Sequence, residues 1–142
     1  MSRSHQIRDL GLKVTGPRLK ILNLFENNPE RHLSAEDVYR LTIEKNMNIG
    51  VATVYRVLSQ FEEVGILKSH NFDTGKAVFE LDRGEHHDHI VCIECGKITE
   101  FLDNEIEELQ NSVAKKHGYE IIDHSMYMYG VCGECRKRKN KA

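Results

Sequence analysis

Hydrophobic positions in the first half of the chain recur every three or four residues, the spacing of one face of an α-helix. One helix is expected to begin after Thr15, which can cap it, with Pro17 in its first turn. Another is expected after Ser34, because Asp37 stands at the spacing of a capping box. The inward positions predicted for these helices are Ile21, Leu22, Phe25, Val38, Leu41 and Thr42.

A third helix is predicted over residues 50–65, which read "GVATVYRVLSQFEEVG". Its predicted buried face consists of Val54, Val57, Leu58 and Phe61, and its opposite face of Ala52, Tyr55, Arg56 and Ser59. An exposed aromatic ring beside an arginine suits contacts with phosphates and base edges in a DNA major groove. An ordinary amphipathic helix with a solvated polar side remains the alternative for this segment alone.

Two strand-like runs follow, residues 66–72 and 76–81, and Asp73, Thr74 and Gly75 between them favour a hairpin. Three short helices followed by a hairpin predict a winged helix-turn-helix with its third helix in the recognition position. The fold class expected is therefore α+β. A winged-helix DNA-binding domain is predicted over residues 1–82, and the polar run "LDRGEHH" is the candidate linker.

Residues 83–142 are predicted to form a small α/β dimerisation domain with a structural zinc site. A helix is expected from an Asn104 cap to Gly118, and strands are expected at 89–91, 98–101 and 119–131. So small a sheet with one helix buries little by itself, which favours pairing across a twofold axis. In this interpretation Tyr127, Met128 and Tyr129 belong to the core or the interface.

The net charge indicates no particular class of partner, because 20 basic residues are nearly balanced by 22 acidic ones. Basic residues gather before residue 25 and in the last seven positions, "RKRKNKA", where a solvated surface or a frayed tail is the ordinary expectation. No apolar run is long enough for a membrane span or a signal peptide, so a cytoplasmic protein without a membrane partner is expected. In that compartment the four cysteines favour metal over disulfides.

The cysteines form two Cys-x-x-Cys pairs, Cys92 with Cys95 and Cys132 with Cys135. Together they supply the four thiolates of a tetrahedral structural zinc site, and a redox dithiol is the alternative. Residues 85–89, "EHHDH", add nitrogen and oxygen ligands. In an extended strand, alternation directs His86 and Asp88 to one side and His87 and His89 to the other, which gives two half-sites. Candidates to complete them are His32, Glu80, Glu100, Glu107 and His124.

From about Leu10 to Cys135 the chain resembles the ferric uptake regulator family. The resemblance is carried by "GLKVTGPR", "HLSAEDVY", "IGVATVYRVLSQFEEVGI", "VFEL", "HHDHIVCIECGKI" and the late Cys-x-x-Cys. It implies an iron-responsive, dimeric transcriptional repressor of iron-uptake genes that binds an A/T-rich palindromic operator in double-stranded DNA when loaded with divalent metal. Assembly into tetramers stays open. Sensors of manganese, zinc or nickel remain alternatives, because ligand type alone does not fix the metal.

Matched residue by residue, the resemblance implies three metal sites and a DNA-binding surface. It implies structural Zn²⁺ on Cys92, Cys95, Cys132 and Cys135, and regulatory Fe²⁺, replaceable by Mn²⁺ or Zn²⁺, on His32, Glu80, His87, His89 and Glu100. It implies a second nitrogen-oxygen site on His86, Asp88, Glu107 and His124. The DNA contacts expected are Lys13, toward the minor groove, with Arg18, Ala52, Thr53, Tyr55 and Arg56.

Two other classes of protein deserve comparison. A zinc hydrolase also gathers histidines and carboxylates, but the chain has no His-Glu-x-x-His motif and no glycine-rich phosphate loop. We therefore expect no enzymatic activity and no small-molecule substrate. A zinc-stapled module that binds partners other than DNA is the remaining alternative, and metal-dependent, salt-sensitive binding to duplex DNA distinguishes it.

Overall fold

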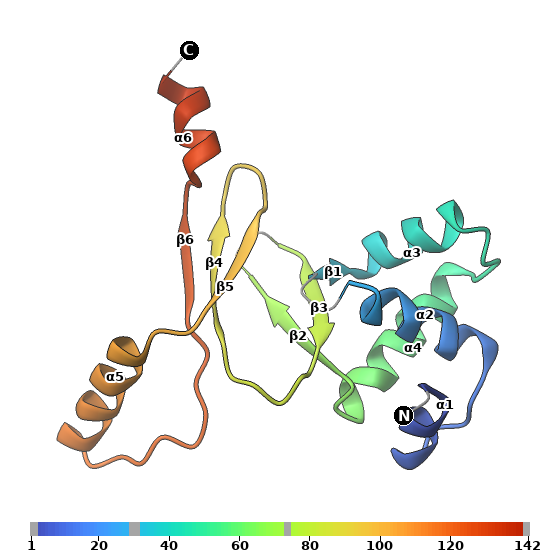
Figure 1. Ribbon diagram of the computed structural model, residues 1–142, viewed down its shortest axis with the longest axis horizontal. Helices are drawn as coiled ribbons and strands as arrows, with labels where there is room; N and C mark the ends of the chain where they lie inside the picture. The colour runs from blue at the N-terminus through green and yellow to red at the C-terminus, as the bar shows by residue number, and fades with distance from the viewer. Residues whose placement is uncertain (1–2, 29–31, 73–74, 141–142) are drawn as a thin grey trace. The chain divides into compact units, whose positions relative to one another are not determined.

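A computed structural model of the chain describes residues 3–28, 32–72 and 75–140. The chain forms two compact units, Met1–Gly84 and Glu85–Ala142 (Figure 1). Each unit has its own three-stranded sheet. Within the described residues, no helix is both long and apolar enough to cross a membrane.

The first unit is a helical cluster with a small antiparallel sheet (Figure 1). Its helices are α1 (Arg3–Asp9), α2 (Gly16–Glu26), α3 (Ala35–Glu44) and α4 (Val51–Glu63). Its strands are β1 (Leu33–Ser34), β2 (Leu67–Asn71) and β3 (Ala77–Leu81), in the order β1-β3-β2. This is a winged helix-turn-helix arrangement in which β2 and β3 form the wing and α4 takes the position predicted for the recognition helix.

Local sequence signals account for the helix starts in this unit. The Thr15 side chain accepts a hydrogen bond from the Arg18 amide at the start of α2. Ser34 and Asp37 form both hydrogen bonds of the predicted capping box of α3. The predicted apolar stripe of α4 is confirmed, because Val54, Val57, Leu58 and Phe61 are its buried residues.

Two elements of the first unit differ from the expectation. No helix was predicted over residues 3–9, but they form α1, whose Ile7 is completely buried in the core. β1 was not predicted, and it adds a third strand by pairing Leu33 with Phe79 and Ser34 with Val78. The hairpin prediction is correct for β2 and β3, while Asp73 and Thr74 lie outside the described residues.

The second unit contains a sheet of order β5-β4-β6 (Figure 1). Its elements are β4 (Asp88–Cys92), β5 (Ile98–Phe101), α5 (Asn104–Lys116), β6 (Tyr127–Gly130) and α6 (Gly133–Asn140). β4 is the central strand, and it pairs antiparallel with β5 and parallel with β6. Among the described residues of this unit, the buried apolar side chains are only Val91, Cys92 and Cys135. Its core is therefore centred on the cysteines.

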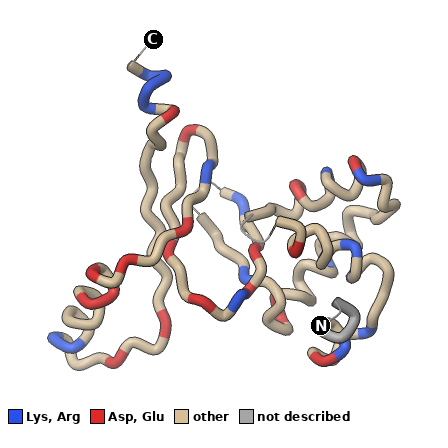
Figure 2. Tube along the Cα trace, viewed as in Figure 1, with Lys and Arg blue, Asp and Glu red and all other residues tan. Residues whose placement is uncertain are grey.

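Two expectations for this unit need correction, and one helix was not predicted. The last strand is β6 alone and does not begin at Tyr119, so His124 precedes it. The N-cap of α5 is Asp103, one residue earlier than the predicted Asn104, and its carboxylate accepts hydrogen bonds from the next helical amides. Residues 133–140 form α6, which was not predicted, and its basic residues from Arg136 to Lys139 are exposed, in agreement with the solvated surface expected there (Figure 2).

Candidate metal centres and recognition helix

The four cysteine side chains lie together in the second unit. The sulfur atoms of Cys92 and Cys135 are 3.9 Å apart, and those of Cys95 and Cys132 are 3.8 Å apart. A disulfide requires sulfur atoms about 2.0 Å apart, so these pairs are not bonded. A tetrahedral zinc ion with Zn–S bonds of about 2.3 Å separates its sulfur ligands by about 3.8 Å. The cluster therefore has the dimensions of a structural zinc site.

Backbone geometry prepares this cluster for thiolate. The Cys132 amide donates to the Cys92 sulfur at 3.3 Å. This bond is the main reason why the pKa of Cys92 is lowered to about 6. Conversely, the pKa of Cys135 is raised to about 12, chiefly by its hydrogen bond with Cys132. Cys92 thus ionises readily whereas Cys135 resists ionisation, an opposition that a central dication removes.

The tight turn between Cys92 and Cys95 depends on the next residue. The Gly96 amide donates to the Cys92 carbonyl at 2.9 Å, and Gly96 has a φ of +79°. Only glycine adopts this left-handed conformation without strain. On the other side, Cys132 immediately precedes α6 and Cys135 lies in its first turn, so the helix fixes their spacing.

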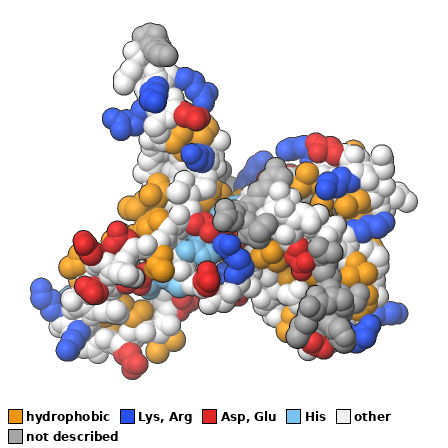
Figure 3. Space-filling model, viewed as in Figure 1, with side chains coloured by type: hydrophobic (Ala, Val, Ile, Leu, Met, Phe, Trp, Pro, Cys, Tyr) orange, Lys and Arg blue, Asp and Glu red, His pale blue; other side chains and the backbone are white. Residues whose placement is uncertain are grey.

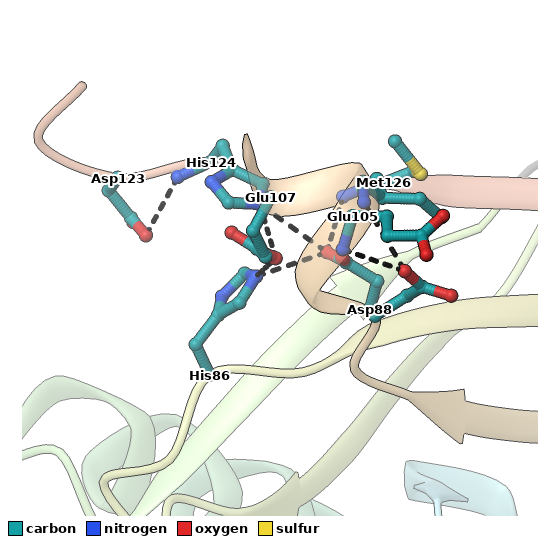
Figure 4. A network of polar contacts seen from close by, with 9 residues as sticks. His86, Asp88, Glu105, Glu107, Asp123, His124 and Met126 are labelled. Carbon is teal, nitrogen blue, oxygen red and sulfur yellow. Dashed lines mark hydrogen bonds and ion pairs between the residues drawn. The ribbon is translucent and has the colours of Figure 1, made fainter. Parts of the chain in front are cut away.

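A second cluster joins β4, α5 and the segment before β6 (Figure 4). His86 Nε2 lies 3.2 Å from Glu107 Oε1 and 3.3 Å from Asp88 Oδ1. His124 Nε2 lies 3.3 Å from the same Glu107 oxygen and 3.8 Å from the same Asp88 oxygen. Asp88 is 1% exposed, and its Oδ1 also accepts a hydrogen bond from the Met126 amide.

These atoms point at one another without forming hydrogen bonds. Within the described part of the chain, the Nε2 atoms of His86 and His124 and Glu107 Oε1 are buried and make none. Buried polar groups are normally satisfied, so such convergence is typical of ligands around an ion. Metal–ligand bonds of about 2.0–2.1 Å separate tetrahedral ligands by about 3.3–3.4 Å, close to the shorter distances here. In Figure 3, histidine side chains lie among acidic ones beside α5.

In the first unit, the Glu80 carboxylate lies between two imidazole rings. Its Oε2 atom forms an ion pair with Nε2 of His32, and its Oε1 atom lies 3.1 Å from Nε2 of His70. His32 stands one residue before Leu33, which pairs with Phe79, so the same antiparallel register brings it opposite Glu80. Glu80 is only 2% exposed, which suits a carboxylate held for a cation.

In the second unit, His87, His89 and Glu100 form a separate group. His89 and Glu100 are direct partners in the ladder between β4 and β5. His87 Nε2 lies 3.3 Å from Glu100 Oε1, and the rings of His87 and His89 are 4.9 Å apart. This group lies apart from the cluster around Asp88, as strand alternation predicted, although β4 begins only at Asp88.

The outer face of α4 carries the residues predicted to contact DNA. Ala52, Tyr55 and Arg56 are exposed, and Thr53 is partly buried. The Tyr55 hydroxyl donates to Glu36 Oε1 at 3.0 Å, which raises the pKa of Tyr55. The Tyr55 hydroxyl is therefore engaged, and its exposed ring is the part available to a base.

Arg18 is placed differently from the other expected DNA contacts. Its guanidinium donates twice to Gln60 Oε1, at 3.2 and 2.9 Å, and once to the Lys13 carbonyl. These bonds tie α2 to the recognition helix and hold the segment that carries Lys13. Gln60 was not singled out from the sequence, because nothing in its local pattern indicates a partner 42 residues away.

A winged helix, a cysteine cluster and three groups of imidazole and carboxylate side chains define a metal-binding transcription regulator. A profile of the ferric uptake regulator family matches residues 9–129. The ferric uptake regulation protein of Neisseria meningitidis is 63% identical over 133 residues, covering 94% of this chain and 92% of that protein. The chain belongs to the ferric uptake regulator family. Its members are iron-responsive transcriptional repressors, so the chain is a DNA-binding, dimeric regulator and not an enzyme.

Solved structures agree with this assignment. The Vibrio cholerae regulator, which shows a rearrangement of its DNA-binding domains, matches with a TM-score of 0.86 and 46% identity over 92% of this chain and 100% of that one. The Francisella tularensis regulator with iron matches with a TM-score of 0.85 and 46% identity, over 89% of this chain and 96% of that one. The Helicobacter pylori regulator, with three functional metal-binding sites, matches with a TM-score of 0.82 and 35% identity, over 92% of this chain and 87% of that one.

Proposed function

We propose that the chain represses iron-uptake genes by binding an A/T-rich palindromic operator when Fe²⁺ fills a regulatory site and Zn²⁺ fills the cysteine cluster. The observation that carries this proposal is the separation of ligand types. Thiolates form one cluster, and imidazoles with carboxylates form the others. Thiolates hold zinc tightly, whereas nitrogen and oxygen ligands bind borderline ions such as Fe²⁺ and Mn²⁺ more reversibly. Chromosomal DNA as partner implies that it acts in the cytoplasm.

The regulatory ligands we propose come from both units. His32 and Glu80 belong to the DNA-binding unit, and His87, His89 and Glu100 belong to the dimerisation unit. A bound divalent ion has a preferred coordination geometry, and all its ligands must fit that geometry at the same time. β1 leads directly into α3, which packs against the recognition helix α4, and β3 pairs with β2, which also packs against α4. His32 and Glu80 would carry the constraint to α4 through these contacts.

Such a constraint acts on DNA binding through geometry. In a dimer, the orientation of each DNA-binding unit sets the separation of the two recognition helices. That separation must match half-sites about 34 Å apart. Arrangements that satisfy the ligands are populated when metal is present, and those arrangements are the ones that fit the operator. Linkage then requires the operator to tighten metal binding by the same factor.

The second nitrogen-oxygen cluster is proposed to support the dimerisation unit. All residues of α5 are described and none of them is buried, so packing holds this helix weakly. Glu107 on α5 and Asp88 on β4 face the same two histidines. An ion at this position, with Zn²⁺ or Fe²⁺ suited to the donors, would connect the helix to the sheet.

The dimer surface is proposed to lie along the apolar side of α5. A hollow of about 560 Å³ is lined there mostly by apolar residues, among them Ile106, Leu109, Val113, Tyr119 and Met126. Leu109 is 66% exposed and Tyr119 is 74% exposed. A patch of this kind on a dimeric protein suits a second copy of the chain. We also propose that dimers pair into tetramers on DNA.

Metal titration tests the proposed function. Duplexes selected by the loaded protein from a randomised DNA library serve as operator, and binding is followed by fluorescence anisotropy. We expect anaerobic Fe²⁺, or Mn²⁺, to tighten binding by about 5- to 150-fold in protein that keeps its zinc. Affinity should also fall steeply with salt. Equal affinity with and without the second metal, at constant zinc by elemental analysis, would contradict the proposal.

Arg56→Ala should weaken operator binding without changing metal uptake. A contact between arginine and a base edge is worth about 1–3 kcal/mol, so a loss of about 5- to 150-fold is expected, with relaxed specificity at one base pair. Arg40→Ala is the matched control, because Arg40 is exposed on α3 and its guanidinium pairs with Asp37. Normal affinity in the Arg56 variant would place the recognition surface elsewhere.

A further inference from the structure

We infer that His70 is a positioning residue for the regulatory metal site, because it holds one oxygen of the Glu80 carboxylate and leaves the other for the ion. The inference rests on the proposed role of Glu80 as a ligand. It adds β2 to the elements that respond to metal, since His70 lies on β2 and Glu80 on β3.

The wing hairpin itself brings the two side chains together. His70 pairs with Val78 and Lys68 pairs with Glu80 in the antiparallel ladder. Residues two apart on a strand share a face, so His70 and Glu80 are diagonal neighbours on the same side of the hairpin. His70 Nε2 lies 3.1 Å from Glu80 Oε1, and His70 is 8% exposed. The contact is therefore buried and built into the register of the wing.

The chemistry of the pair fixes its direction. An ionised carboxylate only accepts hydrogen bonds, so the Nε2–H group of His70 is the donor. The ring is also held in place, because it stacks on Phe72 with centroids 5.5 Å apart and planes 5° apart. A ring fixed by stacking and by register acts as a rigid donor.

This arrangement determines how Glu80 meets a cation. Oε1 is engaged by His70, whereas Oε2 is the oxygen directed at His32. Without His70 the carboxylate would rotate, and orienting it would cost free energy when metal binds. Removing hydrogen bonds that orient metal ligands typically weakens metal binding by about 10- to 100-fold. A displacement of β2 would likewise change the orientation of the Glu80 carboxylate, because His70 lies on β2.

The test measures Mn²⁺ binding to the full-length, zinc-loaded protein by calorimetry and by the electron paramagnetic resonance of free Mn²⁺. A His124→Ala background removes the second nitrogen-oxygen cluster from the measurement. His70→Leu removes the donor, His70→Asn places an amide near the position of Nδ1, and His70→Gln places one near Nε2. Asn71→Leu is the control, because Asn71 is the next residue on β2 and is exposed.

We expect His70→Leu and His70→Asn to weaken Mn²⁺ binding by about 10- to 100-fold, and His70→Gln and Asn71→Leu to stay within about threefold of the parent. Equal weakening in the Gln and Asn variants would overturn the inference, because a packing role predicts no difference between them. If circular dichroism shows that His70→Leu does not fold, the difference in Mn²⁺ affinity between His70→Gln and His70→Asn is the test.

Two further variants separate this inference from the proposed function. If His32→Ala loses Mn²⁺ binding while His70→Asn binds normally, the regulatory site stands and the role of His70 is wrong. If His32→Ala and His87→Ala both keep full Mn²⁺ affinity, the proposed regulatory site itself is wrong, and with it the basis of the inference.

Discussion

Replacing Cys135 by serine is expected to abolish zinc binding, dimerisation and operator binding together, while the DNA-binding unit stays folded. The reason is the composition of the second core, where the buried apolar side chains of the described residues are Val91 and two of the cysteines. So small an apolar core does not stabilise a domain alone, and metal-binding free energy takes its place. Adding Mn²⁺ should not restore operator binding.

The measurements for this variant are zinc content, sedimentation and thermal unfolding followed by circular dichroism. The circular dichroism that the folded second unit contributes at low temperature should be lost. The thermal unfolding transition of the first unit should persist. Glu134→Ala is the matched control, because Glu134 is exposed in α6 between Cys132 and Cys135. A zinc-free Cys135→Ser dimer with normal unfolding would show that the cysteine cluster is not structural.

The sequence predicted best those features whose cause lies within a few residues. The capping box of Ser34 and Asp37 and the buried stripe of α4 depend only on spacing within one helix, and both are confirmed. The cap of α5 shows the limit of such signals. Asp103 and Asn104 are adjacent and both suit the position, and the charged carboxylate is favoured at a helix N-terminus.

Features that depend on a distant partner were less predictable. The alternating pattern over residues 119–131 suggested one long strand, but β4 offers partners only from His89 to Cys92, and these pair with Tyr127 to Gly130. The preceding residues have no strand beside them and remain irregular. Likewise, α1 was missed because Ile7, the one buried side chain among residues 6–9 whose burial the structure describes, gives no periodicity.

The division of the histidine and carboxylate side chains around β4 into two groups could be predicted from the sequence, because it depends only on strand alternation. Strand alternation separates His86 and Asp88 from His87 and His89 wherever the strand begins. The role of His70 depends on the register of the wing, which is symmetric about residue 74, since 70 pairs with 78 and 71 with 77. That register was available from the predicted turn at residues 73–75, so a diagonal search around Glu80 would have found His70.

His87→Ala is expected to remove the response to metal while leaving a folded, zinc-containing dimer. His87 lies outside β4, so truncating it leaves the strand pairing of the sheet intact, but it removes the nitrogen beside Glu100. Operator affinity should then change less than about twofold on adding Mn²⁺, compared with about 5- to 150-fold in the unmodified protein. Affinity without added metal should be the same in both proteins, because the recognition helix is unaltered.

Anisotropy titrations with and without Mn²⁺, alongside zinc analysis and sedimentation, check this result. Glu85→Ala is the control, because Glu85 is exposed two residues earlier and belongs to none of the metal-ligand groups. A retained metal response in His87→Ala would exclude this histidine from the regulatory site. Loss of zinc or of the dimer would instead mean that His87 supports the fold. Only the combination of intact zinc, intact dimer and lost response fits a ligand whose occupancy selects the DNA-binding arrangement.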